Sequence, residues 1–446
     1  MTRFAVVLIA VCLLILPVWA RKAPARHRAV AVAPAIPAAT VSPTGEPLLG
    51  ASGAILMDSR TGLVLWEKNA DQPLPMASTT KIMTAMVLLD NEKGRMNQMV
   101  TVSHNAASTG GSSWLAEGDR VTLDDLLKGA LLCSSNEATV AAGEFVAGSE
   151  AKFVELMNAK AKELGLKNTH FINPHGLTNA KIDGGGHYSS ARDLATMARY
   201  AMLNYPLIKQ YVSLGRPRPL MVNCTPRGQI YTPNHNKLLG TTVPGFPDAI
   251  VDGVKTGYVN ESGKCYVSSA TRGDFQLIAV VLNSPDMYRE AQTLFTYGFT
   301  RYEWKTFAAV GQPVGDVPVQ YGATRTAPVT VTTVIGAPVL KAEYGTTAKD
   351  TIAVAAKKLT APVARGENAG TCELRRDGVL IASAPAISLG ATSLSTGVRA
   401  LRALGLTLLS MLMLLLAGKI YGTCSKSARR RRRGFAPTGR NTDTGG

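Results

Sequence analysis

Residues 76–89 read MASTTKIMTAMVLL, and this stretch combines a buried helix with a lysine near its start. From Ile82 to Leu89 almost every side chain is apolar, so the sequence predicts a helix that lies inside a domain. A fully buried lysine such as Lys81 is rarely tolerated unless it is paired, and burial lowers its pKa towards that of a neutral amine, which is a base. Ser78 precedes Lys81 by three positions, on the same face of a helix. The stretch therefore predicts a serine hydroxyl that a neutral lysine activates.

A second serine-lysine pair in this chain shows that the spacing alone is a weak signal. Chance produces such a pair about once or twice in a chain of this length. Ser149 and Lys152 have the same spacing, but they open an amphipathic helix in which the lysine can face water. Only the pair at residues 78 and 81 stands at the head of an apolar helix, which makes it the candidate catalytic pair.

The charge of the chain lies mostly at its two ends. The 446 residues carry a net charge of +17, which would suit a nucleic-acid-binding protein. Basic side chains are concentrated in residues 1–50 and 396–446, however, and the body between them is nearly neutral. The sequence therefore predicts no nucleic-acid-binding surface, and its length allows two or three domains.

The first 20 residues resemble a secretory signal peptide. Arg3 precedes an apolar run, and Val18-Trp19-Ala20, with smaller residues on either side of the tryptophan, offers a cleavage site. Several basic residues follow at 21–28, and positive charge after an apolar segment opposes its export, so an uncleaved anchor remains an alternative. Residues 21–47 are rich in alanine and proline without a helical or strand period, which predicts a flexible spacer.

Residues 401–421 predict a transmembrane helix near the other end of the chain. They are apolar on all sides, whereas a helix lying in the membrane surface would have a polar face. Residues 422–446 form a basic tail with five consecutive arginines at 429–433, and such a tail stays in the cytoplasm. We therefore expect a cell-membrane protein whose body faces the periplasm or the cell exterior.

The body divides into two parts by its sequence pattern. Residues 48–303 have strand patterns at both ends and helical patterns between them, which predicts an α/β domain with a largely antiparallel sheet. Residues 304–395 contain short runs rich in valine and threonine, separated by glycine and proline, which predicts a small all-β domain. The cysteines and histidines lack the spacing of metal ligands, so no metal site is predicted. His170, His175 and His187 are interpreted as loop residues that at most frame a site.

Two further motifs accompany the serine-lysine pair. Residues 131–138 read LLCSSNEA, in which Ser134 and Asn136 flank Ser135 between two helices. Residues 252–258 read DGVKTGY, which places Lys255, Thr256 and Gly257 near the end of a predicted strand. Each motif is weak alone, and residues 103–105 (SHN) imitate the first. The ordered set of three is the signature of penicillin-binding proteins and serine β-lactamases.

The chain resembles the low-molecular-mass penicillin-binding proteins, which are serine-type D-alanyl-D-alanine carboxypeptidases. Further segments carry this resemblance: LMDSRTGLVLWEKNAD at 56–71, FINPHGL at 171–177, HYSSARDLA at 187–195 and NHNKLLG at 234–240. Residues 361–389 resemble the β-rich second domain of these enzymes. The resemblance implies the penicillin-binding and serine β-lactamase-like transpeptidase fold for the catalytic domain, with a small C-terminal all-β domain. Ser135 stands where the family often has glycine.

The resemblance also implies a role for each motif residue. Ser78 is expected to attack the carbonyl between two terminal D-alanines, Lys81 to accept its proton, and Ser134 to relay a proton towards the leaving amine. The remaining residues are expected to bind the substrate, a peptidoglycan stem peptide: Asn136, Lys255, Thr256, Gly257, Tyr258 and Arg289. β-Lactam antibiotics are expected as inhibitors, and no cofactor is expected.

Two alternatives remain open at this point. A serine β-lactamase would need a glutamate that activates water, and Glu163 is the nearest candidate in the sequence, on the polar face of a predicted helix. A D,D-endopeptidase or transpeptidase would use the same acyl-enzyme, because either water or an amine can resolve it. A non-catalytic wall-binding module is disfavoured, because all three motifs are present.

Overall fold

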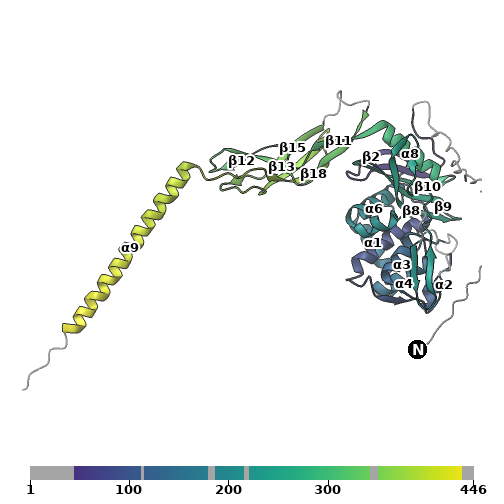
Figure 1. The fold of residues 1–446 in the computed structure, drawn as a ribbon, viewed down its shortest axis with the longest axis horizontal. Helices are drawn as coiled ribbons and strands as arrows, with labels where there is room; N and C mark the ends of the chain where they lie inside the picture. Colours follow the sequence, from purple (N-terminus) through teal and green to yellow (C-terminus); the bar gives the residue numbers. More distant parts are fainter. Residues whose placement is uncertain (1–44, 112–114, 179–185, 215–219, 342–349, 434–446) are drawn as a thin grey trace, which may run out of the picture. The chain divides into compact units, whose positions relative to one another are not determined.

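The computed structural model describes residues 45–111, 115–178, 186–214, 220–341 and 350–433. The predicted signal peptide (1–20), most of the spacer (21–47) and the last part of the basic tail lie outside the described residues. The predicted α/β class with an antiparallel sheet and a β-rich C-terminal part is confirmed (Figure 1).

A six-stranded antiparallel sheet forms the centre of the first part. Its order is β2 (Val64–Lys68), β1 (Gly53–Asp58), β10 (Phe275–Ser284), β9 (Gly263–Arg272), β8 (Phe246–Val259) and β7 (Thr242–Val243). The first hairpin of the described chain thus pairs with a strand more than 200 residues later, with Ala54 opposite Val281. Every residue of β1 is buried, as in a strand covered on both faces.

Helices cover the two faces of this sheet. The elements are η1 (Ala77–Thr80), α1 (Lys81–Asn91), α2 (His104–Ser108), α3 (Leu123–Leu131), α4 (Asn136–Ala147), α5 (Glu150–Glu163), α6 (Ala191–Asn204), α7 (Pro206–Val212) and α8 (Met287–Arg301). Two small two-stranded antiparallel sheets complete this part: β3 (Met99–Thr101) with β4 (Arg120–Thr122), and β5 (Leu220–Cys224) with β6 (Gly228–Thr232).

Alternation along the strands divides the core into two layers. Ile55 and Ile278 pack with α1 and the other helices of one face, whereas their neighbours Leu56 and Leu277 pack with Phe295 of α8 on the opposite face. Successive side chains of a strand point to opposite sides, so the apolar runs of β1 and β10 supply both layers. The helix α1 lies inside the larger layer, which explains why it has no polar face.

The C-terminal part is built almost entirely of strands. Its six-stranded sheet has the order β15 (Asp350–Ala356), β17 (Asn368–Arg376), β18 (Val379–Ser388), β13 (Thr326–Val331), β12 (Gly315–Gln320) and β16 (Leu359–Thr360). A second sheet pairs β11 (Tyr302–Ala308) with β14 (Ile335–Leu340). Small apolar side chains such as Ala337 and Val329 fill two modest cores, which suits a β-sandwich-like module.

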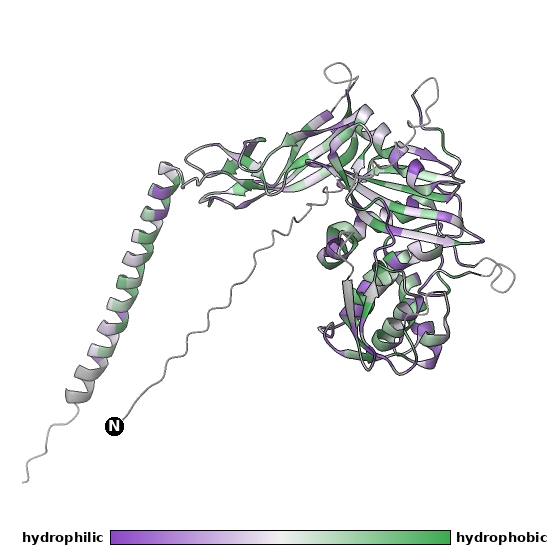
Figure 2. Ribbon diagram, turned by 45° about the vertical axis from the view of Figure 1, so that its right-hand side comes forward, coloured by the Kyte–Doolittle hydropathy of each residue, from purple (hydrophilic) through white to green (hydrophobic). Residues whose placement is uncertain are grey.

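The last described element is the helix α9 (Thr396–Arg433), which is longer at both ends than the predicted span 401–421. Within Thr396–Lys426 an apolar window of 18 residues has a mean hydropathy of 2.1, and none of this window is buried within the protein. Figure 2 shows the hydrophobic residues along the middle of this helix. An exposed apolar helix of this length is suited to a lipid environment.

Candidate active site

The serine-lysine pair lies where η1 passes into α1. Ser78 is the second residue of η1, and Lys81 is the first residue of α1. The three-residue spacing brings Lys81 Nζ to 2.9 Å from Ser78 Oγ, as the sequence predicts. The competing pair behaves differently: Ser149 is the N-cap of α5, and Lys152 is exposed.

The amine of Lys81 is fully buried and is held by neutral groups. Besides Ser78 Oγ, its Nζ lies 2.7 Å from Asn136 Oδ1 and 2.7 Å from the carbonyl oxygen of His175. In the described part of the chain its hydrogen bonds include none to a carboxylate. Burial therefore lowers the pKa of Lys81 well below its ordinary value, and the charge of Lys255 lowers it further, against a smaller opposing effect of Glu137.

These three contacts give the amine a defined orientation. A neutral amine has two N–H groups and one lone pair. The oxygens of Asn136 and His175 can only accept, so they take the two N–H groups. The lone pair then remains for the hydroxyl hydrogen of Ser78 at 2.9 Å. This arrangement can remove a proton from the serine without any rearrangement of the lysine.

A cleft of about 540 Å³ opens in front of the serine. Six of the nine site residues predicted from the sequence line it: Ser78, Ser134, Asn136, Thr256, Gly257 and Tyr258. Lys81 and Lys255 are buried, at 0% and 2% exposure, and are not among the lining residues. Arg289 is half-buried in the first turn of α8 and is also not among them, although its neighbours Met287 and Tyr288 are.

Strand β8 approaches the nucleophile closely at Gly257. A Cβ atom on this residue would lie 3.0 Å from the backbone nitrogen of Ser78 and 3.1 Å from the oxygen of Met76. Any larger residue would therefore push the strand away from η1. The glycine of the Lys-Thr-Gly motif is explained by this contact, because only glycine allows the two backbones to face each other across the cleft.

The preceding lysine of the same strand is a buried cation. Lys255 Nζ donates to the carbonyl oxygen of Thr256 at 2.9 Å. Burial lowers the pKa of Lys255 to about 8. The charge of Lys255 in turn disfavours a proton on the buried amine of Lys81.

Ser134 lies in the short connection between α3 and α4. It has a φ of +64°, in the left-handed region that few residues other than glycine adopt. The next residue, Ser135, is the N-cap of α4 and also donates to Glu137 Oε2 at 3.0 Å. Ser135 has a φ of −59°, so this position does not require the glycine that the family often has there. The departure from the family pattern leaves its two neighbours in the cleft.

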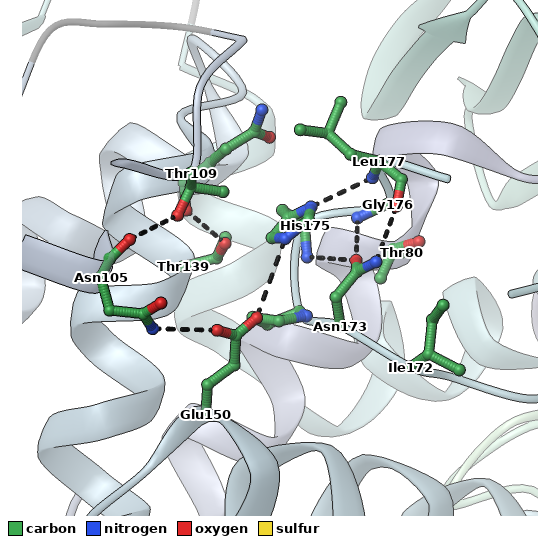
Figure 3. Close-up of polar contacts among 12 residues, drawn as sticks. Thr80, Asn105, Thr109, Thr139, Glu150, Ile172, Asn173, His175, Gly176 and Leu177 are labelled. Atoms are coloured by element: carbon green, nitrogen blue, oxygen red, sulfur yellow. Dashed lines mark hydrogen bonds and ion pairs between the residues drawn. The ribbon is translucent and has the colours of Figure 1, made fainter. Parts of the chain in front are cut away.

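The loop at residues 171–177 supplies a functional group that the sequence did not reveal. Asn173 Oδ1 accepts from the backbone N–H groups of His175 and Gly176, and its Nδ2 donates to Leu177 O at 2.7 Å (Figure 3). This turn presents the carbonyl oxygen of His175 to Lys81. The Asn-Pro-His-Gly sequence is a turn signal, but a backbone carbonyl leaves no trace of its own in a sequence.

The ring of His175 is buried beside the site. Its Nδ1 accepts from the N–H of Leu177, and its Nε2 lies 3.8 Å from Glu150 Oε1 (Figure 3). Burial lowers the pKa of His175 to about 3. Among the described residues no group of three or more His, Cys, Asp or Glu side chains is arranged to hold a metal ion.

Comparison with known proteins agrees with this geometry. The family model described as D-alanyl-D-alanine carboxypeptidase matches residues 40–286, and that of the penicillin-binding protein 5 C-terminal domain matches residues 302–392. The D-alanyl-D-alanine carboxypeptidase DacF of Bacillus subtilis is 38% identical over 349 residues, which cover 77% of this chain and 86% of the relative. The D-alanyl-D-alanine carboxypeptidase DacC of Escherichia coli is 36% identical over 362 residues, which cover 76% of this chain and 84% of the relative.

A solved structure gives the same result for the fold. The crystal structure of penicillin-binding protein 5 from Haemophilus influenzae is 30% identical and superposes with a TM-score of 0.61, covering 79% of this chain and 100% of that one. The sequence motifs, the serine-lysine geometry and both family models lead to one conclusion: the chain belongs to the D-alanyl-D-alanine carboxypeptidase family of penicillin-binding proteins.

Proposed function

We propose that this protein is a serine D-alanyl-D-alanine carboxypeptidase that removes the terminal D-alanine from peptidoglycan stem pentapeptides through an acyl-enzyme on Ser78. The observation that carries the proposal is the buried amine of Lys81, 2.9 Å from Ser78 Oγ and oriented by two carbonyl oxygens. Membership of the carboxypeptidase family supports the same reaction.

In the acylation step, Lys81 takes the hydroxyl proton while Ser78 Oγ attacks the carbonyl carbon between the two D-alanines. The carbonyl oxygen becomes negative. The backbone N–H groups of Ser78 and Tyr258 are the donors we assign to it, and Gly257 is the residue that lets their two segments approach. The N-terminal end of α1 adds a favourable dipole behind the serine.

Breakdown of the tetrahedral intermediate releases D-alanine and leaves the peptide esterified to Ser78. We assign to Ser134 the relay of the hydroxyl proton from Lys81 to the leaving amine, since it lines the cleft with the nucleophile. Asn136 also lines the cleft, where we expect it to bind the amide of the substrate. In addition, its side-chain oxygen orients the amine of Lys81. Water then hydrolyses the ester and regenerates the hydroxyl.

The terminal carboxylate of the substrate needs a positive partner. Thr256 lines the cleft and offers a hydroxyl, and the buried Lys255 directly precedes it on β8 and offers a cation. We keep Arg289 as the second proposed cation, because it follows two residues that line the cleft. A carboxypeptidase requires such a site, because the bond that it cleaves is one residue away from the free carboxylate of its substrate.

The β-lactamase alternative is disfavoured by the position of its candidate base. Glu163 is the last residue of α5, where it pairs with Lys160 and is largely exposed. The residues described as lining the cleft include no carboxylate. An endopeptidase or a transpeptidase would use the same acyl-enzyme on a different donor or acceptor peptide. The following experiment distinguishes them from a carboxypeptidase by the products released.

We expect the full-length protein to release free D-alanine from a stem pentapeptide and to form one penicillin adduct, at Ser78. The Lys81→Ala variant should lose both activities by at least about 100-fold, because it removes the base. Chromatography of the products and mass spectrometry of the adduct measure the two activities.

Lys152→Ala is the matched control, because it alters an exposed lysine with the same spacing from a serine. Its activity should equal that of the wild type. A cross-linked dimer as the main product would show a transpeptidase, and an unchanged adduct rate in Lys81→Ala would show that another group activates Ser78.

The pKa of Lys255 predicts a loss of activity in alkali. Lys255 is a cation below its pKa of about 8 and neutral above it, so kcat/KM for an Nα-acetylated peptide with a free terminal carboxylate should fall as the pH rises through about 8. The Lys255→Arg variant keeps its charge, so its decline should move to higher pH. The same decline in both proteins would assign it to a different group.

We also propose that α9 anchors the protein in the cell membrane, with the catalytic domain facing the periplasm or the cell exterior and the basic tail inside. The exposed apolar helix supports the anchor. Protease added to intact spheroplasts should then digest the catalytic domain and spare a tag placed at the C-terminus. A protected catalytic domain would contradict this topology.

A further inference from the structure

We propose that Thr80 and His187 are positioning residues for the nucleophile. Through a chain of hydrogen bonds they hold the backbone of Ala77, and with it the hydroxyl of Ser78 against Lys81. This inference rests on the proposed role of Ser78.

The residue before the nucleophile has a strained backbone. Ala77 has a φ of +48°, in the left-handed region, and it is fully buried. A non-glycine residue keeps such a conformation only where its surroundings impose it, and residues of this kind concentrate at active sites. The direction of the chain at Ala77 determines where η1 begins and therefore where Ser78 Oγ lies. The groups that hold Ala77 are thus part of the site's geometry.

Two side chains form a chain that ends on Ala77. The hydroxyl of Thr80 donates to Ala77 O at 2.7 Å. The same hydroxyl oxygen lies 2.8 Å from His187 Nε2, and His187 Nδ1 accepts from the backbone N–H of Ile172 at 3.2 Å. Because Nδ1 accepts, the ring hydrogen is on Nε2, and His187 donates to Thr80. Every hydrogen bond in the chain therefore has one direction, from Ile172 to Ala77.

The loop that orients the base packs on the same two groups. A Cβ atom on Gly176 would lie 2.0 Å from Ala77 O and 2.9 Å from Thr80 Oγ1. Gly176 directly follows His175, whose carbonyl oxygen accepts from Lys81. One framework of Thr80, His187 and this loop thus fixes both the nucleophile and its base relative to each other.

Burial makes this chain sensitive to the loss of any member. Thr80 and His187 are 0% and 1% exposed, so water cannot replace a missing hydroxyl. Loss of the Thr80 hydroxyl would remove one hydrogen bond from Ala77 O and one from His187 Nε2. A displacement of about 1 Å of a reacting group can slow a reaction by about 100-fold. A threonine that only caps its own helical turn would not depend on His187.

The test compares two pairs of variants in the full-length protein. Thr80→Val removes the hydroxyl and keeps the shape, whereas Thr80→Ser keeps the hydroxyl. His187→Phe removes the Nε2 hydrogen, whereas His187→Gln can place an amide N–H at the same position. The rate constant of Ser78 acylation by penicillin, the dissociation constant of the preceding non-covalent complex and the midpoint of thermal unfolding are measured for each.

We expect Thr80→Val and His187→Phe to acylate at least about tenfold more slowly at an unchanged dissociation constant, and Thr80→Ser and His187→Gln to stay within about threefold of the wild type. The double variant Thr80→Val/His187→Phe should be no slower than its slower parent, because both changes break one chain.

Three results would overturn the proposal. The first is acylation of Thr80→Val at the wild-type rate. The second is an equal loss of acylation rate in both Thr80 variants or in both His187 variants, and the third is additive losses of rate in the double variant. Should Thr80→Val fail to fold, the two His187 variants decide by the same criterion. Absence of an adduct in the wild type is a separate result, which refutes the role of Ser78 itself.

Discussion

The chemistry of this protein depends on one buried amine, which hydrogen-bonds to no carboxylate among the described residues. Lys81 lies inside the larger apolar layer, and its neighbours there are a hydroxyl and two carbonyl oxygens. A carboxylate at this distance would keep the lysine charged, and a charged lysine cannot accept a proton. Burial alone would leave a base with no fixed direction, so the acceptors Asn136 and His175 are as necessary as the burial itself.

The fold meets these requirements by bringing distant segments to one point. Ser78 lies in η1 and the buried Lys81 begins α1. Asn136 begins α4, the loop at 171–177 brings His175, and β8 borders the cleft with Gly257. The central sheet pairs β1 with β10 and β9 with β8, so its order fixes β8 beside η1. Gly176 allows the loop at 171–177 to lie close to Ala77, and Gly257 allows β8 to lie close to Ser78.

Much of this could be predicted from the sequence because it is written in local patterns. The apolar run after Lys81, the serine spacing and the order of the three motifs are visible without a structure, and so is the β-rich C-terminal part. The carbonyl of His175 could not be predicted, since a backbone atom has no residue-type signature. Thr80 and His187 are 107 positions apart, and only the fold reveals their contact. The proposed role of Arg289 rests on the family resemblance, since it is not among the described residues that line the cleft.

The most direct test of this account is the protonation state of Lys81 in the intact protein. Carbon-13 NMR of the lysine side chains reports it through the Cε resonance, which the Lys81→Ala variant assigns. We predict that Lys81 titrates well below its ordinary pKa of 10.5, and that Lys255 titrates near pH 8 as an internal comparison. A Lys81 resonance that remains that of a charged amine up to about pH 10 would contradict the account.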